Sequence, residues 1–198
     1  MSKAKAIVLG CALFAALIGL IGCAANNRAT STTATGTTTT QTAADATTKQ
    51  TAAIDTATEA RGTSVGNLAP EFKLAQTNGA EVSLDSLRGK PAVIVFWTAW
   101  CPFCKEEAPH INELAAKYEP RGVRVLGIDI QDSEARTAGG IRDFGIKYAV
   151  ARDADASIAK AYKVQGTPTI IFLNKDGVVR YTGNELPADY AAQLDALL

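Results

Sequence analysis

The sequence predicts an α/β fold in which a mixed β-sheet carries helices on both faces. Strand-like apolar runs alternate with helical patterns from residue 92 onward, and two antiparallel strands with a final helix complete the chain. This order of elements is typical of a mixed sheet covered by helices. Residues 66–198, about 130 in all, are enough to bury a hydrophobic core. We therefore expect one folded domain over these residues.

The domain is expected to begin with a β-hairpin. Residues 71–75 and 81–84 flank Asn78-Gly79, a pair that strongly favours a tight hairpin turn. Residues 92–97 then form a continuous apolar run rich in β-branched side chains. Such a run is typical of a parallel strand that is covered on both faces.

A helix is predicted over residues 102–118. Pro109 lies inside it and is expected to kink it. The apolar residues of this segment fall on one helical stripe, which consists of Phe103, Ile111, Leu114, Ala115 and Tyr118.

The remaining elements continue the alternation of strands and helices. The next three are strand 123–129, a weaker helix over 133–145 that is interrupted by Gly139-Gly140, and a short strand over 148–151. The last four are a helix capped by Asp153 or Asp155 and carrying Ile158, Ala161 and Tyr162, strands 169–173 and 178–182, and a helix opened by Pro187 with Tyr190, Leu194 and Leu197 on one face.

Two cysteines, Cys101 and Cys104, stand where strand 92–97 gives way to helix 102–118. At such a junction, unpaired backbone N–H groups and the helix dipole stabilise a thiolate on the first cysteine. The second thiol, one turn later, can attack a mixed disulfide that forms at the first. The pattern therefore indicates a redox centre.

A zinc site and a purely structural disulfide are both disfavoured for this cysteine pair. A structural zinc site needs about four ligands, yet Cys11 and Cys23 lie near the N-terminus and His110, expected on the surface, is the only histidine. A structural disulfide over so short a loop would remove little chain entropy. We expect no metal, and no cofactor beyond the Cys101–Cys104 disulfide.

Residues 1–22 have the pattern of a targeting segment. Lys3 and Lys5 precede an apolar run, Ala6 to Ile21, that is short for a membrane-spanning helix. The run ends in Leu20-Ile21-Gly22-Cys23, which resembles the lipobox of bacterial lipoproteins. That resemblance implies cleavage before Cys23, lipidation of its thiol and a membrane anchor facing the extracytoplasmic side. The alternative is ordinary secretion or an uncleaved anchor.

Residues 23–65 are expected to form a disordered, threonine-rich tether. Fourteen threonines occur between Thr30 and Thr58, and no aromatic residue occurs between Phe14 and Phe72. Such a segment cannot bury enough apolar surface to offset the entropy of ordering. The whole chain is formally neutral, with 20 basic and 20 acidic residues, so we expect no nucleic-acid partner.

The folded part, residues 66–198, resembles the thioredoxin fold, and within it the membrane-tethered thiol-disulfide oxidoreductases of the TlpA/ResA type. The resemblance rests on an αβ insert over about residues 130–151 and on three motifs in the same order, which are Phe96 to Pro109, Gly166 to Thr169 and Phe172 to Gly177. It implies a thioredoxin fold with an N-terminal β-hairpin and a central αβ insert.

The resemblance also implies roles for the motif residues. Cys101 is expected to be the exposed nucleophile and Cys104 the buried resolving thiol. Pro168 matches a cis-proline that faces the disulfide and leaves the backbone of Thr167 free to pair with a substrate strand. Trp100 is expected to shield the disulfide.

Glu107 matches an acidic residue that this subfamily places three positions after the second cysteine. Close to the thiols, its carboxylate would exchange a proton with the resolving sulfur. Val95 stands where thioredoxin itself carries an aspartate, which makes Glu107 the expected substitute. The dipeptide Pro102-Phe103 supplies no cation to stabilise a thiolate, so we expect a reductant or isomerase rather than an oxidant.

The activity implied is the reduction or exchange of disulfides in exported proteins, which in this family include apocytochromes c. Electrons would come from a membrane thiol carrier, and we expect a monomer. A thiol peroxidase stays open as an alternative: Thr98 fits its pattern, but Ile94 stands where it needs a proline. A copper chaperone on the same fold needs a wider cysteine spacing and a distal histidine, and no histidine follows His110.

Overall fold

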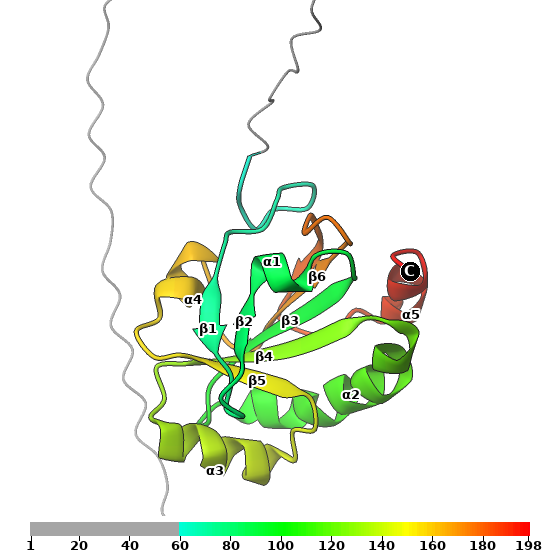
Figure 1. The fold of residues 1–198 in the computed structure, drawn as a ribbon. Helices are drawn as coiled ribbons and strands as arrows, with labels where there is room; N and C mark the ends of the chain where they lie inside the picture. The colour runs from blue at the N-terminus through cyan, green and yellow to red at the C-terminus, as the bar shows by residue number, and fades with distance from the viewer. Residues whose placement is uncertain (1–59) are drawn as a thin grey trace, which may run out of the picture. The chain divides into compact units, whose positions relative to one another are not determined.

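A five-stranded mixed sheet forms the centre of the computed structural model, which describes residues 60–198. Strands β3, β4 and β5 run parallel, β6 is antiparallel to β3, and β7 is antiparallel to β6 (Figure 1). The order across the sheet is β5-β4-β3-β6-β7. The strands are β3 (Ala92–Trp97), β4 (Arg124–Ile130), β5 (Ala149–Asp153), β6 (Thr169–Leu173) and β7 (Val179–Gly183).

Helices and a hairpin cover both faces of this sheet, as expected. One face carries α2 (Pro102–Tyr118), α3 (Glu134–Phe144) and α5 (Tyr190–Asp195). The other carries α1 (Leu84–Leu87), α4 (Ser157–Ala161) and the hairpin of β1 (Lys73–Ala75) and β2 (Glu81–Ser83). A short 3₁₀ helix, Glu119–Arg121, follows α2. The element pair α3–β5 is the expected αβ insert.

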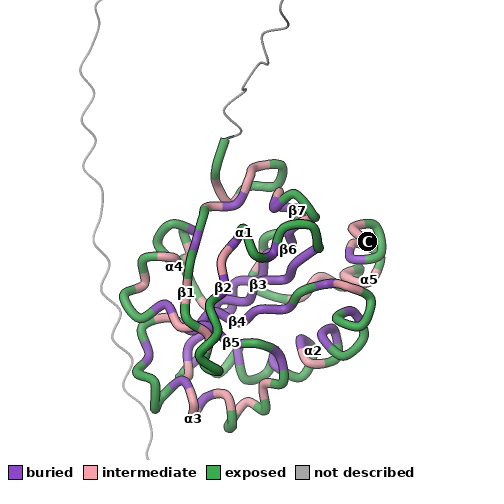
Figure 2. The backbone as a smooth tube through the Cα atoms, viewed as in Figure 1, coloured by how far each residue is buried: buried purple, intermediate pink, exposed green. Residues whose placement is uncertain are grey.

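Strand β3 is buried on both faces because its side chains alternate between two hydrophobic clusters. Val93 and Val95 pack with α2 and α5, whereas Ile94 and Phe96 pack with the hairpin and α4. Figure 2 shows this strand and its neighbours as buried and the outer surfaces of the helices as exposed. Full burial of each such side chain contributes about 1.5–3 kcal/mol. The middle of the sheet is therefore a rigid support for whatever follows β3.

Helix α2 has the predicted bounds, but Phe103 does not belong to its buried stripe. The Phe103 side chain is 66% exposed, and Cys104 instead lies on the inner face with Ala108 and Ile111. One residue corresponds to about 100° around a helix. Phe103 precedes Cys104, the first residue of this buried row, by one position, so its side chain points away from the sheet. The prediction that Phe103 belongs to the buried stripe of the helix is therefore wrong.

Both aspartates predicted as caps of the helix at residue 157 take part in capping. Asp153 is fully buried at the end of β5, and its carboxylate accepts hydrogen bonds from the N–H groups of Ile158 and Ala159 at 3.2 and 2.7 Å. Asp155 accepts from the N–H of Ser157 at 3.0 Å. The last helix, α5, begins at Tyr190, later than predicted, since the carbonyl of Pro187 is used in a turn to the N–H of Tyr190.

The expected start of the domain, residue 66, is later than the structure indicates. Residues 60–65 already contact the domain: the N–H of Gly62 donates to the carbonyl of Leu68 at 2.9 Å, and Thr182 donates to the carbonyl of Thr63 at 2.9 Å. The predicted signal peptide 1–22, Cys23 and residues 23–59 of the predicted tether lie outside the described residues. Over residues 60–198, no helix is long and apolar enough to cross a bilayer.

Helix α3 runs unbroken through Gly139-Gly140, so the predicted interruption is wrong. A Cβ atom at position 140 would come within 2.8 Å of both Ala99 Cβ and Trp97 Cζ3. Gly140 therefore lets α3 approach the segment between β3 and Cys101 more closely than any other residue would. Tertiary packing accounts for this glycine, not a break in the helix.

We predict that Gly140→Ala destabilises the domain and that Gly139→Ala does not. The added methyl at 140 would overpack the contact with Trp97, at a cost of about 1–3 kcal/mol. A methyl at 139 meets nothing closer than 4.0 Å and should raise stability by about 0.5–1 kcal/mol through helix propensity. Urea unfolding of both variants measures the difference, and equal stabilities would contradict this packing.

Candidate active site

Cys101 and Cys104 are joined by a disulfide at the N-terminus of α2, directly after β3. Their Cα atoms are 5.2 Å apart. Cys101 is the N-cap residue of the helix, and its Sγ accepts a hydrogen bond from the N–H of Cys104 at 3.1 Å. When the disulfide is reduced, the N–H of Cys104 and the helix dipole stabilise negative charge on the Cys101 sulfur.

The expectation that Cys101 is exposed is wrong for this disulfide form. Cys101 is 3% exposed and Cys104 is 5% exposed. The segment before Pro168 covers the first sulfur, since the carbonyl oxygen of Thr167 lies 3.3 Å from Cys101 Sγ. The two sulfurs therefore differ in their position relative to the helix N-terminus, not in access to solvent.

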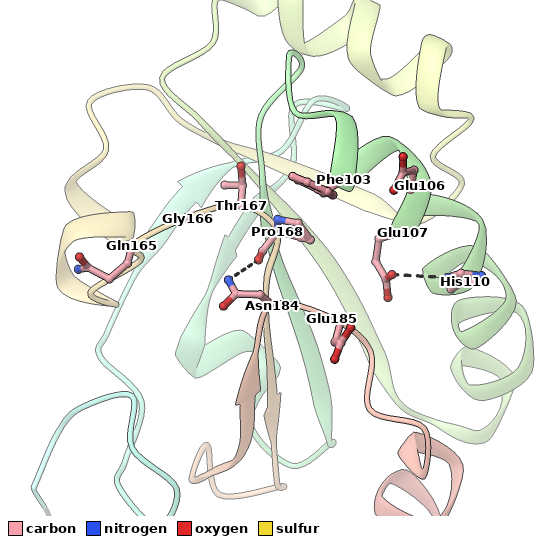
Figure 3. Close-up of a pocket in the computed structure, with 10 residues that line it drawn as sticks. All are labelled: Phe103, Glu106, Glu107, His110, Gln165, Gly166, Thr167, Pro168, Asn184 and Glu185. Carbon is pink, nitrogen blue, oxygen red and sulfur yellow. Dashed lines mark hydrogen bonds and ion pairs between the residues drawn. The ribbon is translucent and has the colours of Figure 1, made fainter. Parts of the chain in front are cut away.

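Residues 165–168 form the opposite wall of the site. The Thr167–Pro168 peptide bond is cis, as the resemblance implied. Asn184 donates from Nδ2 to the carbonyl of Pro168 at 2.8 Å (Figure 3). The hydroxyl of Thr169 donates to the carbonyl of Gly166 at 2.7 Å. These bonds hold the backbone of Thr167 against the disulfide.

Glu107 lies one turn further along α2, with its side chain 16% exposed. It lines a small internal cavity together with Cys104 and Trp97. One oxygen accepts from the N–H of Leu186 at 3.0 Å, and the other lies 3.5 Å from Nδ1 of His110 (Figure 3). Glu107 is thus also part of the link between α2 and the segment that follows β7, and His110 is its exposed neighbour.

The two aromatic residues that flank Cys101 lie on the surface. Trp100 is 69% exposed and Phe103 is 66% exposed, whereas Trp97 is fully buried. Trp100 lines a cavity beside Thr167. The structure places the Thr167 carbonyl against Cys101 Sγ, and shielding of the disulfide by the Trp100 side chain stays a prediction.

Two buried aspartates behind the disulfide are absent from the residues predicted for the site. Asp132, 4% exposed, accepts a hydrogen bond from the N–H of Ala99 at 2.7 Å. Asp129, 1% exposed, pairs in register with Trp97 and accepts from the hydroxyl of Thr137. Asp129 could have been noticed in the sequence, because it ends the apolar run 123–129 and a charged residue is rarely buried without a partner.

Asp129 and Asp132 place buried acidic groups on β4 and its following loop, not on β3 as in thioredoxin. Burial raises the pKa of Asp129 to about 7, and the neighbouring Asp132 carboxylate acts in the same direction. Between about pH 4 and 7, the folded protein thus holds a proton that the unfolded chain releases. This contribution to stability is complete below about pH 4 and is lost as the pH rises through about 7.

We therefore expect Asp129→Asn to flatten the dependence of stability on pH. The free energy of unfolding of the wild type should fall between about pH 4 and 7 more steeply than that of the variant, by about one proton per molecule. Urea unfolding at several pH values measures this slope. Asp155→Asn is the control, since hydrogen bonds lower the pKa of Asp155 below 3.8 and its effect falls outside this window. Equal slopes for wild type and Asp129→Asn would refute the assignment.

Two features bear on the metal and peroxidase alternatives. Within residues 60–198, no group of three or more His, Cys, Asp or Glu side chains is arranged to hold a metal ion. Ile94 stands where a peroxidase needs a proline, and it packs in the cluster on the hairpin face of the sheet. Cys101 belongs to a separate small cluster with Trp97 and Val150.

Comparison with known proteins places these features in a family. The model of the AhpC/TSA family matches residues 65–182. Thiol-disulfide oxidoreductase ResA from Bacillus cereus is 33% identical over 115 residues, which span 58% of this chain and 66% of that protein, just under two thirds of its length. ResA from Geobacillus thermodenitrificans is 30% identical over 142 residues, covering 71% of this chain and 82% of that protein.

Solved structures agree with the expected fold. A putative thiol:disulfide interchange protein DsbE from Chlorobium tepidum is 26% identical, with a TM-score of 0.60, and covers 67% of this chain and 94% of that chain. A secreted disulfide oxidoreductase from Mycobacterium tuberculosis, homologous to DsbE, is 30% identical, with a TM-score of 0.56, and covers 64% and 96%. The chain therefore has the thioredoxin-like fold and belongs to the AhpC/TSA family, in which it resembles the thiol-disulfide oxidoreductases named ResA.

Proposed function

We propose that this protein is a thiol-disulfide oxidoreductase that works outside the cytoplasm and is tethered to a membrane through Cys23. It would reduce or exchange disulfides in exported proteins, apocytochromes c among them, with electrons from a membrane thiol carrier. The observation that carries the proposal is the Cys101–Cys104 disulfide at the N-terminus of α2, facing cis-Pro168. The names of the relatives support the reaction class.

The chemistry follows from the placement of the two sulfurs. In the reduced protein, the Cys101 thiolate attacks a client disulfide, so that a mixed disulfide forms and one client sulfur leaves as a thiolate that takes up a proton. Cys104 then loses its proton, for which Glu107, which lines the same small cavity, is the proposed acceptor, and attacks Cys101 Sγ. The second client thiol is released, and the two electrons of the dithiol have passed to the client.

The surroundings of the sulfurs favour a reductant. Pro102-Phe103 places no cation between the cysteines, and the three charged residues that follow on α2 within two turns are one cation, Lys105, and two anions, Glu106 and Glu107. Negative charge near a thiolate raises its free energy, which favours the disulfide form of the protein and hence donation of electrons to clients. The equilibrium of the Cys101–Cys104 couple with glutathione would measure this direction.

The proposed location rests on the N-terminal sequence. The run Ala6 to Ile21 and the lipobox-like Leu20 to Cys23 fit an exported, lipid-anchored chain. Disulfide exchange with folding proteins also suits an oxidising compartment outside the cytoplasm. The threonine-rich segment would then separate the catalytic domain from the membrane surface.

Cys104→Ser is expected to trap client proteins as mixed disulfides. With the resolving thiol removed, a client bound to Cys101 can no longer be released by attack from Cys104. Non-reducing gels of cells producing the variant should show adducts that vanish on reduction. Cys101→Ser is the matched control and should trap none, because the remaining cysteine, Cys104, lies within α2 and not at its N-cap. Equal adduct levels in both variants would overturn the assigned roles.

Cys23→Ala is expected to release the protein from membranes. Without a thiol at this position, no lipid can be attached, and a fractionated cell should show the protein in soluble fractions instead of with the membrane. Labelling with a radioactive fatty acid provides an independent readout. Membrane association equal to that of the wild type, without any label in either protein, would contradict the lipid anchor.

A further inference from the structure

The buried disulfide lies beneath a backbone segment that is shared by two cavities. One cavity, of about 630 Å³, contains Phe103 and the other, of about 560 Å³, contains Trp100. Both are lined by Gln165, Gly166 and Thr167. Since the carbonyl of Thr167 lies 3.3 Å from Cys101 Sγ, the segment that the two cavities share also covers the disulfide.

Each cavity has one exposed aromatic side chain. Among residues 60–198, the large apolar side chains that are strongly exposed are Val65, Trp100 and Phe103. Two of these three therefore flank the disulfide, one in each cavity. Exposed aromatic residues that line surface cavities are typical of surfaces that bind other polypeptides.

The two cavities carry opposite charge. The Phe103 cavity is lined by Glu106, Glu107 and Glu185, with His110 as its basic residue (Figure 3). The Trp100 cavity is lined by Lys160 and Lys163 and by no acidic residue.

These charges are not neutralised within the domain. In the part of the chain that the structure describes, Lys160, Lys163, Glu106 and Glu185 form no ion pair. All four are exposed. Such groups are available to a partner, and opposite charge across an interface mainly sets specificity and the rate of association.

We propose that this site selects client polypeptides by charge polarity. The client is an extended segment with cationic residues on one side of its reactive cysteine, which enter the Phe103 cavity, and anionic residues on the other side, which enter the Trp100 cavity. The backbone of Gly166 and Thr167 provides the edge along which the segment lies. This inference rests on the proposed exchange of disulfides with client proteins and names the class of client.

Four peptides test the proposal. Each carries a central cysteine blocked as a mixed disulfide with 2-mercaptoethanol and two charged residues on either side. The charges are Lys then Glu, Glu then Lys, Lys on both sides, or Glu on both sides. We expect the reduced protein to react with one of the two dipolar peptides about tenfold faster than with its reverse, and with the uniform peptides at intermediate rates. The ratio should approach 1 at about 1 M salt, where the Debye length is about 3 Å.

A charge-reversed variant assigns the selectivity to the Trp100 cavity. Lys160→Glu with Lys163→Glu should reduce the tenfold ratio to near 1, because the anionic side of the peptide loses its partners. The control, Lys90→Glu with Lys147→Glu, changes the net charge equally. These two lysines precede β3 and β5, at the end of the parallel strands opposite to Cys101. The control should keep the tenfold ratio.

The outcomes separate this proposal from the proposed function. A wild-type protein that reduces the small neutral disulfide of 2-mercaptoethanol but reacts with all four peptides within a factor of two overturns the charge selection alone. A ratio that survives in the Lys160/Lys163 variant also overturns it. A wild-type protein that reduces neither the neutral disulfide nor any peptide overturns the proposed function itself.

Discussion

Burial of β3 on both faces fixes the position of the reactive disulfide. The strand cannot shift or rotate without exposing either Val93 and Val95 or Ile94 and Phe96 to water. Its end is therefore a fixed point, and α2 begins there with Cys101 as its N-cap. The segment between them is held from the side by Asp132, through the N–H of Ala99, and by α3, which Gly140 brings close. A disulfide that opens and closes needs such a rigid base.

Electrostatics around the sulfurs divide into a local and a wider contribution. Locally, the N–H of Cys104 and the start of α2 favour charge on the Cys101 sulfur. Glu106 and Glu107 on the same helix oppose it, and Asp129 and Asp132 add buried acidic groups behind the site. Of these acidic residues, Glu106 and Glu107 also line the Phe103 cavity, which is part of the surface proposed to meet a client. The proposed reduction of clients and the proposed preference for a dipolar client both rest on the charges around this disulfide.

Several functional features are predictable because they are local in the sequence. The apolar run 92–97 and the helix 102–118 follow from patterns within about 25 residues, and the structure has them at the predicted bounds. Two predictions are wrong for a common reason, namely that Phe103 packs in the core and that Gly139-Gly140 breaks a helix. In both cases the result depends on which part of the folded chain lies against the residue. The spacing of apolar residues along the sequence does not contain that information.

Patterns in the amino-acid sequence are sufficient to identify the reactive cysteine pair, the strand–helix junction that activates it, and the family resemblance. The cysteine pair and the junction depend on neighbouring residues, and the resemblance depends on short motifs whose order along the chain is enough to recognise it. Tertiary packing, in contrast, is what buries Cys101 beneath Thr167, 66 residues away, and binds Asp132 to Ala99 across 33 residues. Packing also places acidic and basic side chains from separate elements around the disulfide as two cavities. No local pattern contains these relations, because they arise when the sheet brings distant loops to the same end of β3.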